Sequence, residues 1–160
     1  MRKPKIYLET TMFNYYLDSE RGLLHEDTVK LFKEIKNGKF EAFTSTHVIE
    51  ELERAPELKR QRMLQLVVKY NLTVLESSIE IESLAKCYVD EGIIPEGSRF
   101  DSLHIATATW HGIDYIFSLN FKHINRLKTK RATAYINERE GYRPVTILSP
   151  MEEVEDEEKT

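Results

Sequence analysis

The stretch RFDSLHIATATWHGIDYIFSLNFKH, residues 99–123, decides the fold class of this chain. Its first half has the small and apolar residues of a buried helix, which Gly112 can end in a left-handed conformation. The apolar run at 115–117 is typical of a short buried strand, and polar residues follow it from Ser118 onward. A carboxylate at a helix start, here Asp101, and polar residues beyond a strand are typical of the binding sites of open α/β folds.

Apolar strands alternate with amphipathic helices along the whole chain. We expect strands at residues 5–8, 40–44, 72–75, 115–117 and 145–148. We expect helices at residues 12–17, 27–36, 46–52, 56–70, 79–91, 101–111 and 124–138. Such alternation favours a parallel β-sheet covered by helices on both faces, which is a three-layer α/β/α fold. No repeat or internal linker interrupts it, so we expect a single domain over residues 1–150.

The charge of the chain is unevenly distributed. The 160 residues carry a formal net charge of -4, but residues 151–160 hold six acidic side chains and one lysine. The other 150 residues hold 22 basic and 21 acidic side chains and are nearly neutral. We therefore interpret residues 151–160 as an acidic, frayed tail.

Cysteine usage and hydropathy predict a cytoplasmic protein. Cys87 is the single cysteine, so the chain forms no internal disulfide, which fits a reducing compartment. No apolar run approaches the roughly 18 residues of a membrane span, and the first residues, MRKPKIYLE, lack the apolar segment of a signal peptide. We expect no membrane association.

Three acidic residues and an asparagine are expected at one edge of the sheet. Glu9 ends the first strand and Asn120 follows the fourth, whereas Glu51 and Asp101 lie early in helices that begin at the same edge. Because parallel strands end at a shared edge, we expect these four side chains to form one acidic pocket. Glu50 is the alternative to its neighbour Glu51.

An acidic pocket of this composition indicates metal-dependent chemistry. Carboxylate and carboxamide oxygens suit Mg²⁺ or Mn²⁺ better than zinc, because hard ions prefer oxygen ligands. A metal held in this way can activate a water for attack on a phosphodiester bond. Thr10 and Ser118 would orient the ligands through hydrogen bonds.

A basic segment follows the expected pocket. We interpret it as a surface that contacts RNA phosphates, with an ordinary solvated helix face as the alternative. The candidate residues are Lys122, Arg126, Lys128, Lys130 and Arg131.

Four segments, YLETT, STHVIEEL, FDSLHIATA and SLNFKHI, resemble in this order the PIN-domain family. The ending GYRPVTILSP resembles the VapC-like toxin branch of that family. The resemblance implies a Mg²⁺- or Mn²⁺-dependent endoribonuclease, often a homodimer and often inhibited by an antitoxin protein. By position, Glu9, Glu51 and Asp101 match the acids of the family. Ser118 matches the hydroxyl before the last motif, and Asn120 stands where many members have a further aspartate.

Two departures from the family pattern leave more than one function open. Glu9 is a longer acid than the usual aspartate, and Asn120 removes a charge. We expect a metal-dependent endoribonuclease, the toxin of a type II toxin–antitoxin pair. The alternative is a catalytically weak or inactive PIN-fold module that binds RNA or protein. A flavodoxin- or receiver-like domain is a third reading, but it would need paired acids after the first strand.

Overall fold

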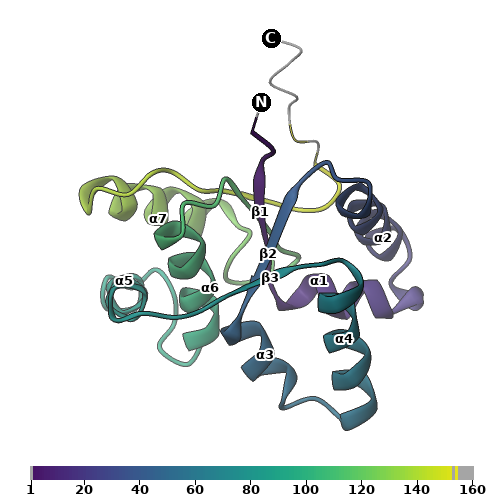
Figure 1. Ribbon diagram of the computed structural model, residues 1–160. Helices are drawn as coiled ribbons and strands as arrows, with labels where there is room; N and C mark the ends of the chain where they lie inside the picture. Colours follow the sequence, from purple (N-terminus) through teal and green to yellow (C-terminus); the bar gives the residue numbers. More distant parts are fainter. Residues whose placement is uncertain (1, 153, 155–160) are drawn as a thin grey trace.

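The computed structural model describes residues 2–152 and 154 (Figure 1). Within these residues, five strands form one all-parallel sheet in the order β3-β2-β1-β4-β5. The strands are β1 (Lys5–Leu8), β2 (Glu41–Ser45), β3 (Thr73–Leu75), β4 (Tyr115–Phe117) and β5 (Thr146–Leu148).

Helices cover both faces of this sheet. The helices are α1 (Thr10–Leu17), α2 (Leu23–Lys36), α3 (Thr46–Leu52), α4 (Glu57–Lys69), α5 (Ile79–Asp90), α6 (Arg99–Trp110) and α7 (Leu127–Arg139), with the short 3-10 helix η1 (Ser19–Arg21). Figure 1 shows α5, α6 and α7 on one side of the strands and α1, α2 and α4 on the other. The predicted three-layer α/β/α fold is therefore confirmed.

The strand order also distinguishes between the readings left open by the sequence. Flavodoxin-like and receiver-like domains have the order 2-1-3-4-5, whereas here β2 lies between β1 and β3. This difference excludes the flavodoxin- or receiver-like reading.

The central strand β1 is buried on both faces. Its register places Tyr7 beside Phe43 of β2 and beside Ile116 of β4. Ile6, Tyr7 and Leu8 are all 0% exposed, as expected for a central strand of a parallel sheet that is covered on both sides. The residue that follows this strand, Glu9, is consequently brought to the edge of the sheet from inside the core.

The first and fourth strands have the predicted bounds, whereas some helix ends differ for identifiable reasons. Helix α1 begins at Thr10, two residues before the expected start, because Glu9 acts as its N-cap. Helix α7 begins at Leu127, three residues later than expected. The amides of Ile124 and Asn125 donate to the carbonyl of Asn120, at 3.2 and 2.8 Å, and this holds the chain in a loop.

The last described residues stay close to the domain. The Glu152 carboxylate accepts a hydrogen bond from the Ser149 amide at 2.7 Å, and Val154 is 9% exposed and joins the hydrophobic core. The predicted frayed tail otherwise concerns residues 153 and 155–160, which lie outside the described residues. Among the described helices, none has the length and apolar character needed to cross a membrane.

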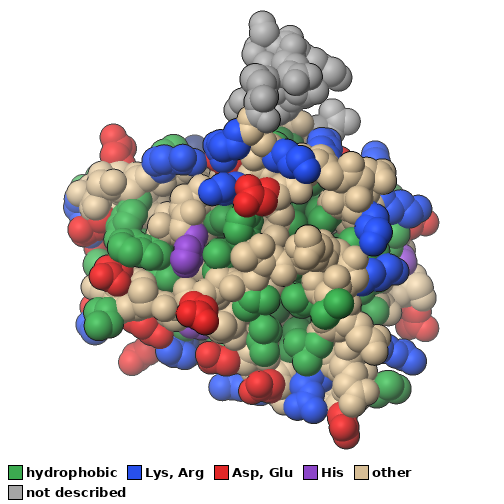
Figure 2. Space-filling model, viewed as in Figure 1, with side chains coloured by type: hydrophobic (Ala, Val, Ile, Leu, Met, Phe, Trp, Pro, Cys, Tyr) green, Lys and Arg blue, Asp and Glu red, His purple; other side chains and the backbone are tan. Residues whose placement is uncertain are grey.

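Figure 2 shows one face of the molecule, where many Lys and Arg side chains lie in the upper part of the view and most Asp and Glu side chains lie below them, with hydrophobic side chains exposed between.

The core position of Ile116 allows a test of the fold. Its side chain is 0% exposed in β4, so Ile116→Ala should leave a cavity and lower the free energy of unfolding by about 2–5 kcal/mol in urea denaturation. The matched control is Val68→Ala on α4, whose effect should stay within about 0.5 kcal/mol because Val68 is 82% exposed. Equal effects of the two substitutions would contradict the burial of β4.

Candidate active site

Glu9 joins the end of the central strand to two other segments. Its Oε1 accepts hydrogen bonds from the Thr11 amide at 3.0 Å and from the Ser118 hydroxyl at 2.9 Å, and the Thr11 hydroxyl also donates to it. The side chain is buried, with 2% of the residue exposed. Burial raises the pKa of Glu9 above its ordinary value, while the charge of His104 and the donated hydrogen bonds reduce that shift.

The loop after β4 connects Glu9 to Asp101. The Ser118 hydroxyl, which donates to Glu9, accepts from the Asn120 amide at 3.0 Å. The Asn120 side chain donates through Nδ2 to Oδ1 of Asp101 at 3.1 Å and accepts through Oδ1 from the His123 amide at 3.0 Å. Asn120 therefore does more than form a turn, because it attaches the loop to helix α6.

Asp101 lies in the first turn of α6, whose N-cap is Ser98. It is not the helix cap, which was the structural alternative for this residue. Burial raises the pKa of Asp101, against the opposing charges of His104 and His123, and the nearby Glu51 raises it further. A carboxylate in these surroundings would be stabilised by a bound cation.

Glu51 is the second acid, and its neighbour Glu50 is exposed. Glu51 lies in the last turn of α3, which is later in the helix than expected. Its Oε1 accepts from the Thr10 hydroxyl at 2.7 Å and from Nε2 of His104 at 2.5 Å. Burial opposes ionisation of Glu51, but the hydrogen bond and charge of His104 outweigh it and lower the pKa of this carboxyl.

His104 is a site residue that the sequence analysis did not include. Its imidazole is buried between Glu51 and the Tyr7 hydroxyl, which lies 2.6 Å from Nδ1. Burial would lower the pKa of His104, but the bond to Glu51 and the surrounding carboxylates raise it. The available signal was its spacing, because residues three apart on a helix share a face and His104 is three residues after Asp101.

Tyr7 extends this network to the start of α3. Its hydroxyl is 2.7 Å from Oγ of Ser45, which is the N-cap residue of α3 but makes no capping hydrogen bond with its side chain. The Ser45 hydroxyl is therefore used to hold Tyr7, and through it His104, rather than to cap a helix.

The structure thus links the predicted pocket residues through hydrogen bonds in two groups. One group runs from Glu9 through Ser118 and Asn120 to Asp101, and the other joins Thr10 to Glu51. The two meet where Thr10 follows Glu9 at the end of β1, and the charge of His104 acts on carboxylates of both groups.

The donor chemistry of this cluster suits a hard divalent cation. Among the described residues, no three His, Cys, Asp or Glu side chains are grouped closely enough to hold a metal ion. Mg²⁺, however, commonly binds one or two carboxylates and completes its coordination with water. Within the same described part of the chain, Glu9 and Asp101 each use only one carboxylate oxygen in hydrogen bonds, so each retains a second oxygen for a cation.

The five candidate RNA contacts are distributed over more than one surface. Lys122 and Arg126 precede α7, and the other three lie in its first two turns. Lys128 and Arg131 line a groove beside α5, and Arg126 and Lys128 line a neighbouring hollow. Lys122 and Lys130 line neither.

Comparison with known proteins identifies the fold. No family model and no curated protein matches the sequence. Among solved structures, VapBC2 from Rickettsia felis, bound to a DNA fragment from its promoter, matches at a TM-score of 0.56 with 14% identity, over 91% of this chain and 98% of that chain. VapC20 from Mycobacterium tuberculosis, a sarcin–ricin loop cleaving toxin, matches at a TM-score of 0.58 with 15% identity, over 88% of this chain and 98% of that chain. The chain has the PIN-domain fold. At these identities the likeness concerns the PIN fold alone.

The opposite pKa shifts of two aspartates lead to a stability test on metal-free protein in EDTA. The folded-state pKa of Asp101 is raised, so its charge costs stability at pH 7, and Asp101→Asn should raise Tm there. This gain should vanish below about pH 4, where the aspartate is protonated in both states. Thermal unfolding monitored by circular dichroism would measure the gain in Tm at pH 7 and its loss at low pH.

Asp114 is the matched control because its carboxylate accepts bonds from Arg2 and from the Lys5 amide. Burial opposes ionisation, but Arg2 outweighs it and lowers the pKa of Asp114. Its stabilising effect is present above about pH 4 and is lost as pH falls through the lowered pKa. Asp114→Asn should therefore lower Tm at pH 7. A lower Tm for both variants would contradict the electrostatic account of Asp101.

Proposed function

We propose that this chain is a metal-dependent endoribonuclease that hydrolyses RNA phosphodiester bonds at the Glu9–Asp101–Glu51 pocket. The observation that carries the proposal is the joining of Glu9 to Asp101 through Ser118 and Asn120. Two carboxylates with raised pKa are thereby held at the edge of a PIN fold, each with an oxygen left for a cation. The similarity in fold to VapC20, a sarcin–ricin loop cleaving toxin, supports this class of reaction.

Each residue of the pocket has a distinct role in this proposal. Glu9 and Asp101 would hold the metal, Mg²⁺ or Mn²⁺, with Glu51 and Asn120 completing its surroundings. Such an ion supplies a lowered pKa for bound water and neutralises charge on the phosphate. The hydroxyl of Ser118 keeps the Glu9 carboxylate in one orientation, and Asn120 does the same for Asp101.

His104 keeps Glu51 ionised and directed toward Thr10. Its Nε2 can only donate to the carboxylate, so the hydrogen bond fixes the position of Oε1. Because the pKa of Glu51 is lowered, this carboxylate carries its charge at neutral pH.

We further propose that the protein acts in the cytoplasm as the toxin of a type II toxin–antitoxin pair and that it forms a homodimer. The toxin role is supported by the similarity in fold to VapBC2 and VapC20. The cytoplasmic location and the homodimer rest on the sequence analysis alone. A neighbouring gene for a DNA-binding antitoxin whose coexpression relieves growth inhibition would support the toxin role. Normal growth on overexpression of the active enzyme alone would count against it.

The second candidate is a PIN-fold module that binds RNA without cleaving it. The observation that favours it is the use of the Asn120 amide nitrogen as a donor to Asp101, where a further acid would have added a ligand charge. Metal-independent RNA binding without turnover would support this candidate over the nuclease.

The Asn120 position gives a prediction on metal binding that does not depend on activity. Asn120→Asp should lower Tm in EDTA, because the hydrogen bond to Asp101 at 3.1 Å is replaced by a like-charge contact. Saturating Mn²⁺ should then raise the Tm of Asn120→Asp by more than it raises that of the wild type. An Asp101→Asn protein should show little Mn²⁺ stabilisation. Equal Mn²⁺ shifts in all three proteins would contradict a metal site here.

Cleavage of a mixed RNA panel with Mn²⁺, Mg²⁺ or EDTA tests the activity. We expect cleavage with either metal and none in EDTA. Glu51→Gln and Asp101→Asn should lower the rate by at least about 100-fold, or about 2.7 kcal/mol. Glu50→Gln is the matched control and should retain the wild-type rate, because that side chain is exposed beside the pocket. Equal loss in Glu50→Gln and Glu51→Gln would contradict a specific role of Glu51, whereas unchanged cleavage in Glu51→Gln and Asp101→Asn would assign the activity to another site or to a contaminant.

A further inference from the structure

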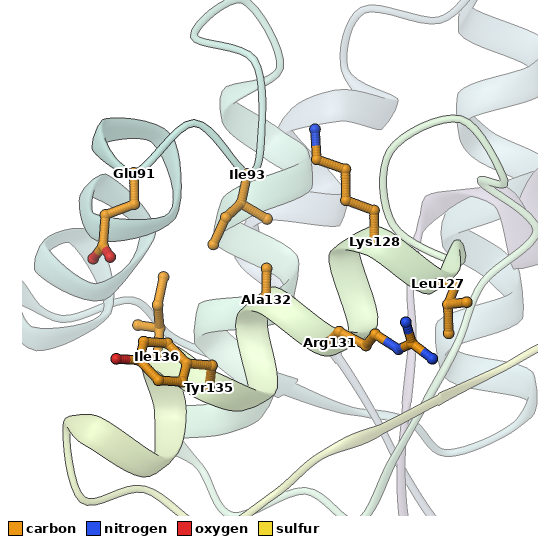
Figure 3. A pocket seen from close by; sticks show the side chains of 8 residues that line it. All are labelled: Glu91, Ile93, Leu127, Lys128, Arg131, Ala132, Tyr135 and Ile136. Atoms are coloured by element: carbon orange, nitrogen blue, oxygen red, sulfur yellow. The ribbon is translucent and has the colours of Figure 1, made fainter.

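We propose that the groove between α7 and the end of α5 binds an unpaired nucleobase of the RNA strand, with Tyr135 as the stacking surface. The inference rests on the RNA substrate of the proposed function and adds a recognition site outside the acidic pocket. The groove has a volume of about 600 Å³ (Figure 3). It is lined by Glu91, Ile93, Leu127, Lys128, Arg131, Ala132, Tyr135 and Ile136.

The groove combines an apolar floor with an exposed aromatic ring. Ile93 and Ile136 are 7% and 1% exposed and belong to the hydrophobic core. Tyr135 and Leu127, by contrast, are 66% and 60% exposed on the same helix. Figure 3 shows Ala132, Tyr135 and Ile136 on α7, with Glu91 and Ile93 across from them at the end of α5. An open aromatic face beside an apolar floor is suited to a flat ring such as a nucleobase.

The charges of the groove favour an anionic ligand. Glu91 is neutralised by Arg139, whose guanidinium donates to both of its carboxylate oxygens at 2.9 and 2.6 Å. Lys128 and Arg131 are exposed, and within the described part of the chain neither pairs with an acid. Two unpaired cations therefore lie within about two helical turns of Tyr135, where they can contact phosphates of a strand whose base stacks on this ring.

A second hollow adjoins the groove and lies beside the loop that leads into α6. It has a volume of about 440 Å³ and shares Ile93 and Lys128 with the groove. Arg126 lines it together with the loop that includes Glu96 and leads into α6, the helix whose first turn holds Asp101. Since the two hollows adjoin, one RNA strand can occupy the groove and extend toward the pocket.

These observations favour RNA over the other occupants of an apolar groove. A second copy of this chain that packed through α7 with its two-fold axis near Lys128 and Arg131 would bring these cations close to those of its partner, which is unfavourable. An acidic peptide would satisfy the cations. It would not account for the continuity of the groove with the hollow that leads toward Asp101.

The experiment compares two labelled ten-nucleotide strands, oligouridine and an abasic strand of equal length, by fluorescence anisotropy in EDTA. All variants are made in the cleavage-deficient Asp101→Asn protein. We expect Tyr135→Ala to weaken binding of oligouridine by roughly 5- to 150-fold and to leave the abasic strand unaffected. Tyr135→Phe keeps the aromatic face and should bind as tightly as the parent. Val68→Ala is the surface control and should also change nothing.

Charge is tested separately with Lys128→Ala and Arg131→Ala. Each should weaken both strands and reduce the dependence of binding on salt concentration, because both strands carry the same phosphates. Equal weakening of both strands by Tyr135→Ala, or no weakening of either, would overturn the base subsite. So would binding of a glutamate-rich helical peptide that depends on Tyr135 while RNA binding does not. Because no arm requires cleavage, a failed nuclease assay would leave this result intact.

Discussion

The buried carboxylate of Glu9 is the constraint on which the rest of the site depends. It lies at the end of the central strand, where 2% of the residue is exposed, and burial of an ionised acid is costly unless hydrogen bonds compensate. Compensation comes from Thr11 at the start of α1 and from Ser118 after β4. The start of α1 and the loop that leads to Asn120 are therefore both bonded to one buried acid.

The remaining charges of the pocket are balanced in a different way. His104 is completely buried, yet its pKa is raised because Glu51 accepts its hydrogen bond and other carboxylates lie nearby. The same bond keeps Glu51 ionised, whereas the pKa of Asp101 is raised. The raised pKa of Asp101 means that its charge costs stability, and such a cost is common at functional sites.

Helix α7 connects this pocket to the proposed recognition groove. Its start follows the loop of Asn120, whose carbonyl accepts hydrogen bonds from the amides of Ile124 and Asn125. The Thr129 hydroxyl, in the first turn of the helix, donates to the His123 carbonyl at 2.6 Å. The exposed residues of α7 then continue away from the pocket along one groove. A single helix thus places surface cations at a defined distance from the acids.

The sequence by itself determined the class of fold and which acids lie near one edge of the sheet, because strand and helix periodicities are local and parallel strands necessarily end at one edge. The sequence also indicated Asn120 and Ser118 as candidate pocket residues, because they follow β4. Helix ends were less predictable where a side chain or carbonyl from outside the helix competes with local propensity, as Glu9 does at α1 and Asn120 at α7. Only the tertiary structure decided that His104 bonds Tyr7 and Glu51, 97 and 53 residues away along the chain. Such pairings depend on how the helices pack on the sheet, and no local pattern in the sequence encodes that packing.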